Sequence, residues 1–130
     1  MRKPILAIPP RRVWFVPRRV LLRRARGCAV ADLQFVCSAG PYELDVLVRE
    51  YPEHLEFIGQ VTWGSRIYEP VPELEVTLID ADSVSLVKAT STNLFGEFDL
   101  QSPGDCHYGL RLGRGDPAPC VSLWEEEALA

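Results

Sequence analysis

The chain has 130 residues, of which 47% are hydrophobic and 25% are charged. This length favours a single globular domain, and this composition excludes a wholly disordered chain. No run approaches the roughly 20 apolar residues that a membrane-spanning helix requires. Eleven prolines and nine glycines favour several short strands over long helices.

The net charge of −4 conceals a division of the chain into a basic and an acidic part. Residues 1–31 hold nine basic residues and no acidic residue. Residues 32–130 hold the other five of the 14 basic residues and all 18 acidic residues, so the two parts carry +9 and −13. A single folded domain rarely needs such a split. We therefore predict a basic, flexible arm over residues 1–31, a folded domain over residues 32–124 and an acidic tail over residues 125–130.

The arm shows no steady hydrophobic period, and two alternatives are open for its second half. Pro17 can occupy the first turn of a short helix that ends at Gly27. The other alternative is an irregular basic extension. Arginine pairs interleaved with Trp14 and Phe15 are candidates for binding the phosphates of a nucleic acid, another polyanion or an anionic lipid. Docking on an acidic partner and folding back on the acidic domain are equal alternatives. These arginines are Arg11, Arg12, Arg18, Arg19, Arg23 and Arg24.

After Asp32, apolar and polar residues alternate with a period of two, which is typical of half-buried strands. Leu47 is an exception, because it lies on the otherwise polar face of its strand. Pro, Gly, Asn and Asp clusters separate the segments and predict turns. The predicted strands are residues 33–37, 42–49, 55–63, 74–78, 84–92, 97–100, 108–112 and 121–124.

This spacing predicts an all-β fold, a small antiparallel β-sandwich of about seven strands with a basic N-terminal extension. One face of each strand buries its apolar side chains against the facing sheet. We expect Val76 and Phe98 to be buried in this core. The residues 80–83 predict a polar hairpin connection, and the residues 93–96 (Asn-Leu-Phe-Gly) predict a tight turn.

The stretch from Gly59 to Leu112 resembles carboxypeptidase regulatory-like domains, which have a transthyretin-like, or prealbumin-like, sandwich. The resemblance rests on short motifs distributed along the chain. They are Gly59-Gln60-Val61, Pro70-Val71-Pro72 before Val76-Thr77-Leu78, Thr90 and Thr92, Phe95-Gly96-Glu97-Phe98, Pro103-Gly104, and Tyr108-Gly109-Leu110-Arg111-Leu112. It implies a mostly non-catalytic accessory, spacing, adhesive or binding module. We expect the protein to be bacterial.

The sequence departs from the family pattern at two turns. Glu73 stands where the family usually has a glycine after the proline-valine entry. Asp82-Ser83 replaces the more usual glycine-bearing hairpin turn. Both departures concern local turn geometry, since glycine is the residue that adopts a left-handed backbone without steric cost.

The residue types do not predict a catalytic or metal site, and we expect no enzyme activity and no cofactor. The two histidines, His54 and His107, are not spaced as zinc ligands, and no cysteines form a CxxC pair. Cys106 and His107 are adjacent in a predicted strand region, so their side chains point to opposite faces. The four cysteines permit two disulfides, but we favour free thiols; they are Cys28, Cys37, Cys106 and Cys120.

The leading hypothesis is a non-enzymatic interaction module that acts through a protein partner, in the cytoplasm because no export signal is evident. One alternative is a carbohydrate-binding module in which Trp63, Tyr68 and Trp124 stack on sugar rings. Alternatively, Trp63 belongs to the hydrophobic core, because it is in phase with the core face of its strand. The other alternative is nucleic-acid or polyanion binding through the basic arm.

Overall fold

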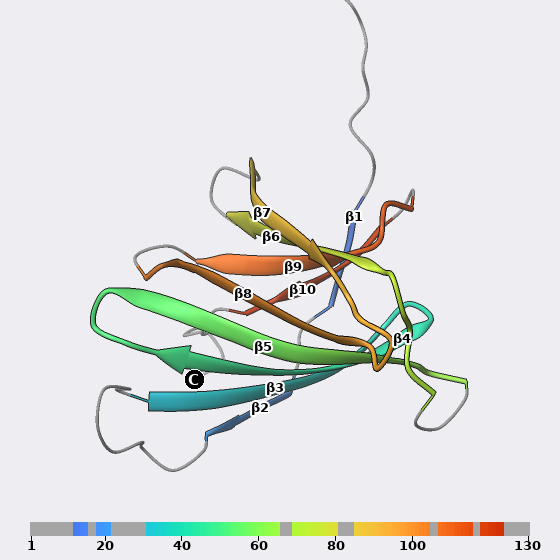
Figure 1. Cartoon of the computed structure of the whole chain (residues 1–130), viewed down its shortest axis with the longest axis horizontal. Helices are drawn as coiled ribbons and strands as arrows, with labels where there is room; N and C mark the ends of the chain where they lie inside the picture. The colour runs from blue at the N-terminus through green and yellow to red at the C-terminus, as the bar shows by residue number, and fades with distance from the viewer. Residues whose placement is uncertain are drawn as a thin grey trace, which may run out of the picture.

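The computed structural model describes residues 12–15, 18–21, 31–65, 69–80, 85–104, 107–115 and 118–123; for residues 12–15, 18–21 and 31–32 it describes the backbone alone. These residues form an antiparallel β-sandwich of eight strands, β3 to β10, and two further short strands pair with its edges. Two layers face each other across the core (Figure 1). No helix within the described ranges is long and apolar enough to cross a membrane. The predicted fold class is confirmed.

The first sheet has the order β2-β3-β4-β5-β8. β3, β4 and β5 follow one another as a meander, and β8 returns to pair with β5. The bounds are β2 Arg18–Leu21, β3 Ala31–Ala39, β4 Tyr42–Glu50, β5 His54–Trp63 and β8 Glu97–Pro103.

The second sheet has the order β1-β10-β9-β6-β7. The chain passes between the sheets from β5 to β6, from β7 to β8 and from β8 to β9, so neither sheet is continuous in sequence. The bounds are β1 Arg12–Phe15, β6 Glu75–Asp80, β7 Ser85–Ser91, β9 Tyr108–Leu112 and β10 Ala118–Ser122.

The alternation of the sequence determines which side chains enter the core. In β8 the side chains of Phe98, Leu100 and Ser102 are buried, whereas those of Glu97, Asp99 and Gln101 are exposed. Val76 and Phe98 are 0% and 5% exposed, as predicted. The ring of Phe98 lies over the bare Cα of Gly59, its cross-strand partner, so any β-carbon at Gly59 would collide with that ring. This pair explains why a glycine is retained in the middle of a long strand.

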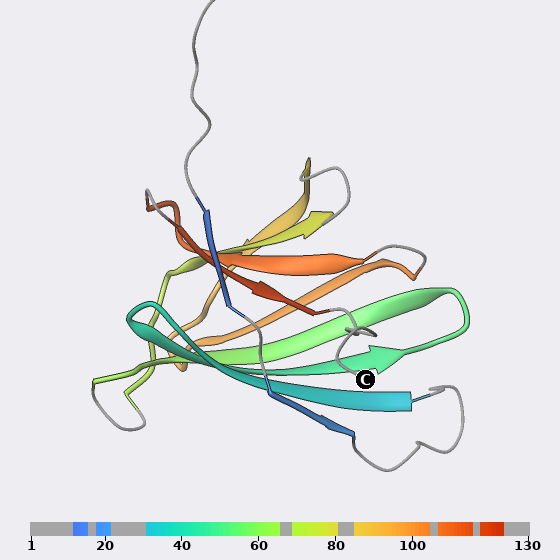
Figure 2. The same ribbon diagram turned by 180° about the vertical axis from the view of Figure 1, so that it is seen from behind.

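Two segments of the predicted arm are strands in the structure. β1 pairs in parallel with β10, and β2 pairs antiparallel with β3. Figure 2 shows both at the same edge of the sandwich, one in each layer. The helix alternative is therefore wrong over Arg18–Leu21, because the open edge of β3 offers these residues backbone hydrogen bonds. Whether the domain folds without residues 1–31 stays a prediction.

Strand ends differ from prediction at two prolines. β10 begins at Ala118 and includes Pro119, whereas the predicted strand begins only at residue 121. Its pairing with β9 begins only at Cys120, so the amide hydrogen that Pro119 lacks is not required for that ladder. β8 continues to Pro103, its last residue, beyond the predicted end at Leu100. Most of the predicted connection at residues 80–83 and the predicted tail at residues 125–130 lie outside the described residues.

Candidate functional site

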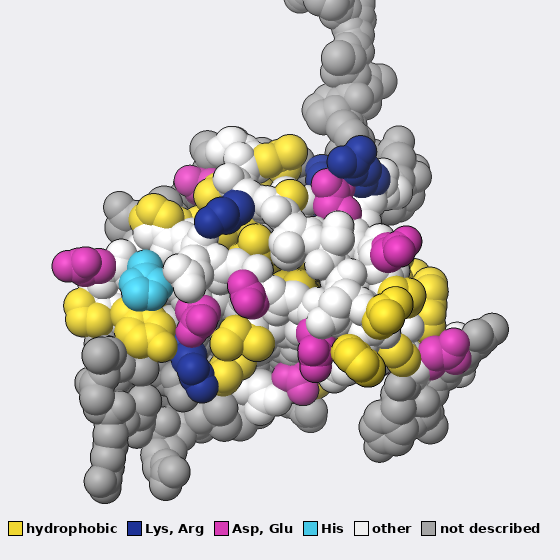
Figure 3. All heavy atoms as spheres, viewed as in Figure 1, with side chains coloured by type: hydrophobic (Ala, Val, Ile, Leu, Met, Phe, Trp, Pro, Cys, Tyr) yellow, Lys and Arg dark blue, Asp and Glu magenta, His cyan; other side chains and the backbone are white. Residues whose placement is uncertain are grey.

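Leu94 and Phe95 are the two most exposed large hydrophobic residues that the structure describes. Their exposed fractions are 74% and 64%, and they occupy the turn between β7 and β8. Figure 3 shows apolar side chains gathered at this end of the sandwich. We name Leu94 and Phe95 the apolar tip. Two large apolar side chains side by side in solvent are costly unless another surface covers them, so they mark a candidate contact site.

The turn that carries the apolar tip is held in one conformation by its own side chains. The Oδ1 atom of Asn93 accepts hydrogen bonds from the amides of Phe95 and Glu97, both at 2.9 Å. The amide of Gly96 donates to the carbonyl of Asn93 at 3.0 Å. Gly96 has φ of +74°, where only glycine fits without strain. The sequence Asn-Leu-Phe-Gly thus encodes a tight turn, as predicted.

Strand β5 anchors this turn from the side. The amide of Val61 donates to the carbonyl of Gly96 at 2.8 Å, and the Nε2 atom of Gln60 donates to the carbonyl of Phe95 at 2.9 Å. The backbone beneath the apolar tip is therefore fixed from two directions. A rigid support lowers the entropy lost on binding, because the tip does not have to be ordered first.

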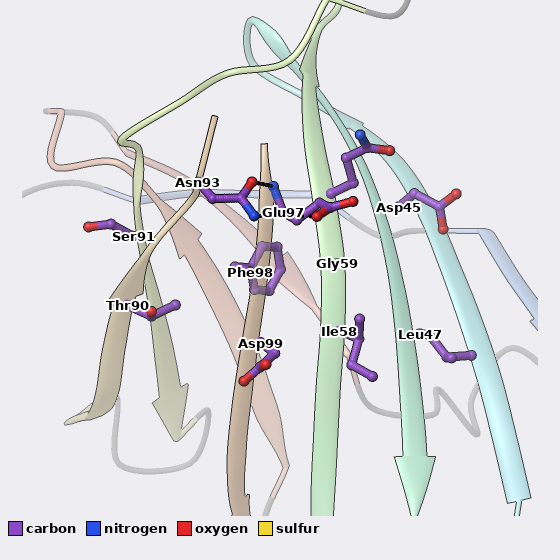
Figure 4. A pocket seen from close by; sticks show the side chains of 11 residues that line it. Asp45, Leu47, Ile58, Gly59, Thr90, Ser91, Asn93, Glu97, Phe98 and Asp99 are labelled. Atoms are coloured by element: carbon purple, nitrogen blue, oxygen red, sulfur yellow. Dashed lines mark hydrogen bonds between the residues drawn. The ribbon is translucent and has the colours of Figure 1, made fainter. Parts of the chain in front are cut away.

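A groove of about 590 Å³ is lined by residues of β4, β5, β7 and β8 and by Asn93, which precedes the apolar tip (Figure 4). Its apolar part includes Leu47 and Ile58, which are cross-strand partners. Its acidic part includes Asp45, Glu97 and Asp99. We name this surface the acidic groove. Its lining includes no lysine, arginine or histidine.

Register places the acidic groove residues in two rows across the sheet. Asp45 and Glu97 lie at the two ends of one row, on either side of Gln60. Leu47, Ile58 and Asp99 form the next row. Carboxylates therefore lie at both ends of the first row, around Gln60, and at the β8 end of the second row, beside Ile58. Two of these carboxylates accept a hydrogen bond from a neutral side-chain amide. Gln34 donates to Asp45 at 2.8 Å, and Asn93 donates to Glu97 at 3.3 Å.

A second groove, of about 480 Å³, lies on the outer face of the other sheet. Its lining includes Glu75, Arg111 and Arg114 together with the exposed Leu86 and Val87 of β7. Arg114 binds both oxygens of Glu75, and its NH2–Oε2 distance is 3.0 Å. This hydrogen bond, with the positive charges of Arg114 and Arg111, lowers the pKa of Glu75. The arginines of this second groove therefore already interact with a carboxylate of the same chain.

The predicted sugar-stacking residues are not shown to share a surface. Trp63 is only partly exposed, packs against the hydrophobic core and lies 5.5 Å from the ring of Tyr42 between centroids. Tyr68 and Trp124 lie outside the described residues. The interpretation of Trp63 as a core-facing residue fits this position, and the glycan site stays a prediction.

The predicted polyanion-binding arginines are only partly described. Arg12 lies in β1, and Arg18 and Arg19 lie in β2, with no description of their side chains. Arg11, Arg23 and Arg24 lie outside the described residues. Polyanion binding by these arginines stays a prediction.

His54, Cys37 and Cys120 lie in stacked or buried positions. His54 stacks on Tyr51 with 4.6 Å between ring centroids, and the described ranges contain no group of three His, Cys, Asp or Glu residues that could hold a metal ion. Cys37 and Cys120 are buried, and the Sγ atom of Cys120 lies 3.7 Å from the carbonyl oxygen of Ala118. Burial, aided by Glu43, raises the pKa of the Cys37 thiol, which disfavours the reactive thiolate. Cys28 and Cys106 lie outside the described residues.

The sequence predicted the turn but not its exposed apolar pair as a site. Two signals pointed to this surface: Leu47 lies out of phase in β4, and a tight turn contains two consecutive large hydrophobic residues. Ile58 gives the same signal, because it alternates with Phe57 and Gly59 of the core face.

Searches of protein-family models, curated proteins and solved structures found no match for this chain.

Proposed function

We propose that this chain is a non-enzymatic interaction module that docks on a protein partner through the apolar tip and the adjoining acidic groove. The observation that carries the proposal is the exposure of Leu94 and Phe95 on a turn that Asn93 and Gly96 hold rigid. Large apolar anchors on a preorganised support are typical of the centre of a protein interface.

The acidic groove gives the partner a definite chemistry. A surface that covers Leu94, Phe95, Leu47 and Ile58 must be apolar at its centre. The carboxylates around the groove favour a partner with lysine or arginine at its rim. Charged rims act mainly on association rate and specificity, whereas the apolar centre supplies affinity.

The carboxypeptidase regulatory-like family is the class of module that we propose for this chain. Three residues of the motifs shared with that family have structural roles in this sandwich. Gly59 gives space to the ring of Phe98, and Gly96 forms the turn before β8. Thr92 accepts a hydrogen bond from the amide of Leu74 at 2.9 Å and so links β7 to the start of β6. Accessory and binding roles are common in that family, in agreement with the proposed module.

The test is affinity capture with the full chain as bait, followed by binding measurements between purified proteins. The tip variant is Leu94→Ser with Phe95→Ser. The matched control is Leu86→Ser with Val87→Ser, which removes the exposed apolar pair of β7, whose members are 55% and 42% exposed. Removal of two anchors is expected to weaken a direct partner by at least about tenfold, because central apolar residues dominate interfaces.

The wild-type chain and the β7 control are expected to bind that partner equally. A partner whose affinity falls with the β7 variant and not with the tip variant would move the interface away from the tip. A glycan that binds the purified chain with equal affinity in both variants would favour the carbohydrate-binding alternative.

A further inference from the structure

Strand β7 is an open edge of the sandwich. It ends the order of its sheet, and no described strand pairs with its outer side. On the opposite side of the sandwich, β1 and β2 pair with the edges of β10 and β3 (Figure 2). An edge strand without a neighbour presents backbone donors and acceptors to which a further strand can pair. β7 is therefore a candidate site for strand addition.

The neighbouring edge strand, β8, is better protected against such pairing than β7. β8 lies beside β7 and ends the order of the other sheet. It carries the exposed carboxylates of Glu97 and Asp99 and ends at Pro103, features that discourage a further strand. β7 contains no proline and no carboxylate, and its protection consists of Lys88 and a bulge at Val87, which has no partner in β6. Of these two edges, β7 is the more available.

The two faces of β7 differ in chemistry. Its register with β6 places Leu86 and Ala89 on the outer face of the sheet, and Lys88 and Thr90 on the face that turns toward the other sheet. The Nζ atom of Lys88 accordingly donates to the carbonyl of Gln101 in β8 at 3.4 Å. A strand added to β7 meets apolar side chains on one face and a cation on the other.

The surroundings of β7 are positively charged in a domain that is acidic as a whole. Of the four basic residues whose side chains the structure describes, three line the second groove, which four residues of β7 also line. They are Lys88, Arg111 and Arg114, and the carboxylate of Glu75 is the single negative group among the described lining residues. This excess of positive charge favours a strand that carries carboxylates.

The same charge disfavours a second copy of β7 as the added strand. Lys88 is the central residue of β7, so a symmetric antiparallel pair of two β7 strands brings both Lys88 side chains together on one face. Like charges opposite each other in a strand pair are destabilising. A strand of different sequence, with a carboxylate near Lys88, replaces this repulsion by attraction.

We propose that β7 accepts an extended strand of a protein partner, with carboxylates on the face of Lys88 and apolar side chains on the face of Leu86 and Ala89. Because β8 is the last strand of the other sheet, no strand of that sheet faces the added one, and its carboxylates remain in solvent. This interface is separate from the apolar tip and takes a partner of the opposite charge. It therefore does not depend on the proposed function.

The first experiment titrates a fluorescein-labelled peptide, Thr-Val-Glu-Val-Glu-Val-Thr, with the full chain and follows fluorescence anisotropy. A comparison peptide has lysine in place of both glutamates. Lys88→Glu reverses the charge of β7, and Arg49→Glu is the matched control in β4 of the other sheet. The acidic peptide should bind Lys88→Glu about fivefold more weakly than the wild type and Arg49→Glu within about twofold of it.

The lysine peptide should show the reverse order and bind Lys88→Glu more tightly than the wild type. Equal affinities of the two peptides for the wild type would overturn the inference. So would the absence of saturable binding of the acidic peptide up to about 1 mM. The tip variant, Leu94→Ser with Phe95→Ser, should bind the acidic peptide as the wild type does. A loss in that variant alone would place the peptide at the apolar tip and overturn the inference, whereas the proposed function would stand.

The second experiment tests whether the peptide pairs through its backbone. Two acidic peptides carry N-methyl groups, one on its valines and one on its glutamates, because successive amides of a strand point to opposite edges. One of them should lose at least about tenfold in affinity and the other should retain it, since main-chain hydrogen bonds supply the affinity of an added strand. Similar affinities of the two would overturn strand addition.

The third experiment measures hydrogen exchange of residues 85–91 by mass spectrometry. Exchange should slow when the acidic peptide is added to the wild type and should change less in Lys88→Glu. Exchange that is already slow without peptide, and that the peptide does not alter, would show that a second copy or another part of the chain covers β7. That outcome would overturn the inference.

Discussion

Two turns at one end of the sandwich share a left-handed backbone residue but meet that requirement with different amino acids. Gly96, between β7 and β8, has φ of +74°, and Glu73, between β5 and β6, has φ of +55°. Glu73 is the single non-glycine residue with positive φ in the described ranges. Both turns are anchored to Val61, whose amide donates to Gly96 and whose carbonyl accepts from Val71.

The space around the β-carbon explains the difference between the two positions. A β-carbon at Gly96 would collide with the backbone oxygen of Val61, which has no freedom to move inside the sheet. The side chain of Glu73 is exposed, and its amide donates to the carbonyl of Thr92 at 3.0 Å. A glutamate can therefore adopt a left-handed backbone conformation where its side chain has space. It becomes exclusive to glycine only where another part of the backbone approaches closely.

The largest effect is expected from Gly96→Ala, which tests the close approach. Strain at a positive φ and the collision with Val61 together should reduce the free energy of unfolding by about 3 kcal/mol or more. Urea unfolding followed by circular dichroism measures it. Gly104→Ala is the control, because the nearest atoms to a β-carbon at Gly104 lie at 3.7 Å. Equal stabilities of the two variants would show that Gly96 is not an obligatory glycine.

A smaller loss is expected from Thr92→Val, which removes the hydroxyl that supports the Glu73 turn. This hydroxyl donates to the carbonyl of Val71 at 2.6 Å and accepts from the amide of Leu74 at 2.9 Å. Its loss should cost about 1–3 kcal/mol, because both groups lose a buried partner. Thr92→Ser keeps the hydroxyl and should retain more of the stability in the same unfolding experiment. A serine variant no more stable than the valine variant would attribute the effect to packing.

A gain in stability is expected from Glu73→Gly, the reverse of the change at Gly96. Relief of left-handed strain outweighs the extra freedom of glycine in the unfolded chain, so the variant should gain about 0.5–1 kcal/mol. Glu73→Ala keeps a β-carbon and should show no comparable gain. A glycine variant that is less stable than the wild type would contradict a strained glutamate at this turn.

The smallest effect is expected in the pH dependence of stability, through Glu75, the first residue of the strand that follows the Glu73 turn. The hydrogen bond from Arg114 holds the pKa of Glu75 below its ordinary value in the folded protein. Its contribution to stability is therefore present above the unfolded pKa and is lost as the pH falls through the folded pKa. Melting temperatures of the wild type and Glu75→Gln should converge as the pH is lowered through the folded pKa of Glu75, below the ordinary glutamate pKa. A constant difference between them would rule out this ion pair as the source.

Much of the fold follows from local patterns along the chain. The period-two alternation predicted most strand positions and the burial of Val76 and Phe98, because a pleated strand places successive side chains on opposite faces. The predicted turn before Glu97 followed from an asparagine and a glycine three residues apart. These are properties of a few consecutive residues, so they can be read without knowledge of the partner strand.

The candidate site could not be predicted from such local patterns. Leu47 and Ile58 become one apolar centre only because the register of β4 and β5 pairs them. Asp99 joins them only because the chain crosses to the other sheet and returns to place β8 beside β5. The strands of the arm likewise depend on the open edges of β3 and β10. Each of these relations joins segments that are distant in sequence.

The sequence by itself determined the all-β class, the position of most strands, the residues of the core and the division of charge. Periodicity and composition are local, and they specify which face of each strand is apolar. Tertiary structure alone decided which strands are neighbours, which hydrophobic residues remain in solvent and why Gly96 is obligatory while Glu73 is tolerated. The physical reason is that these outcomes depend on contacts across the sandwich, where Val61 brings both turns to the same place.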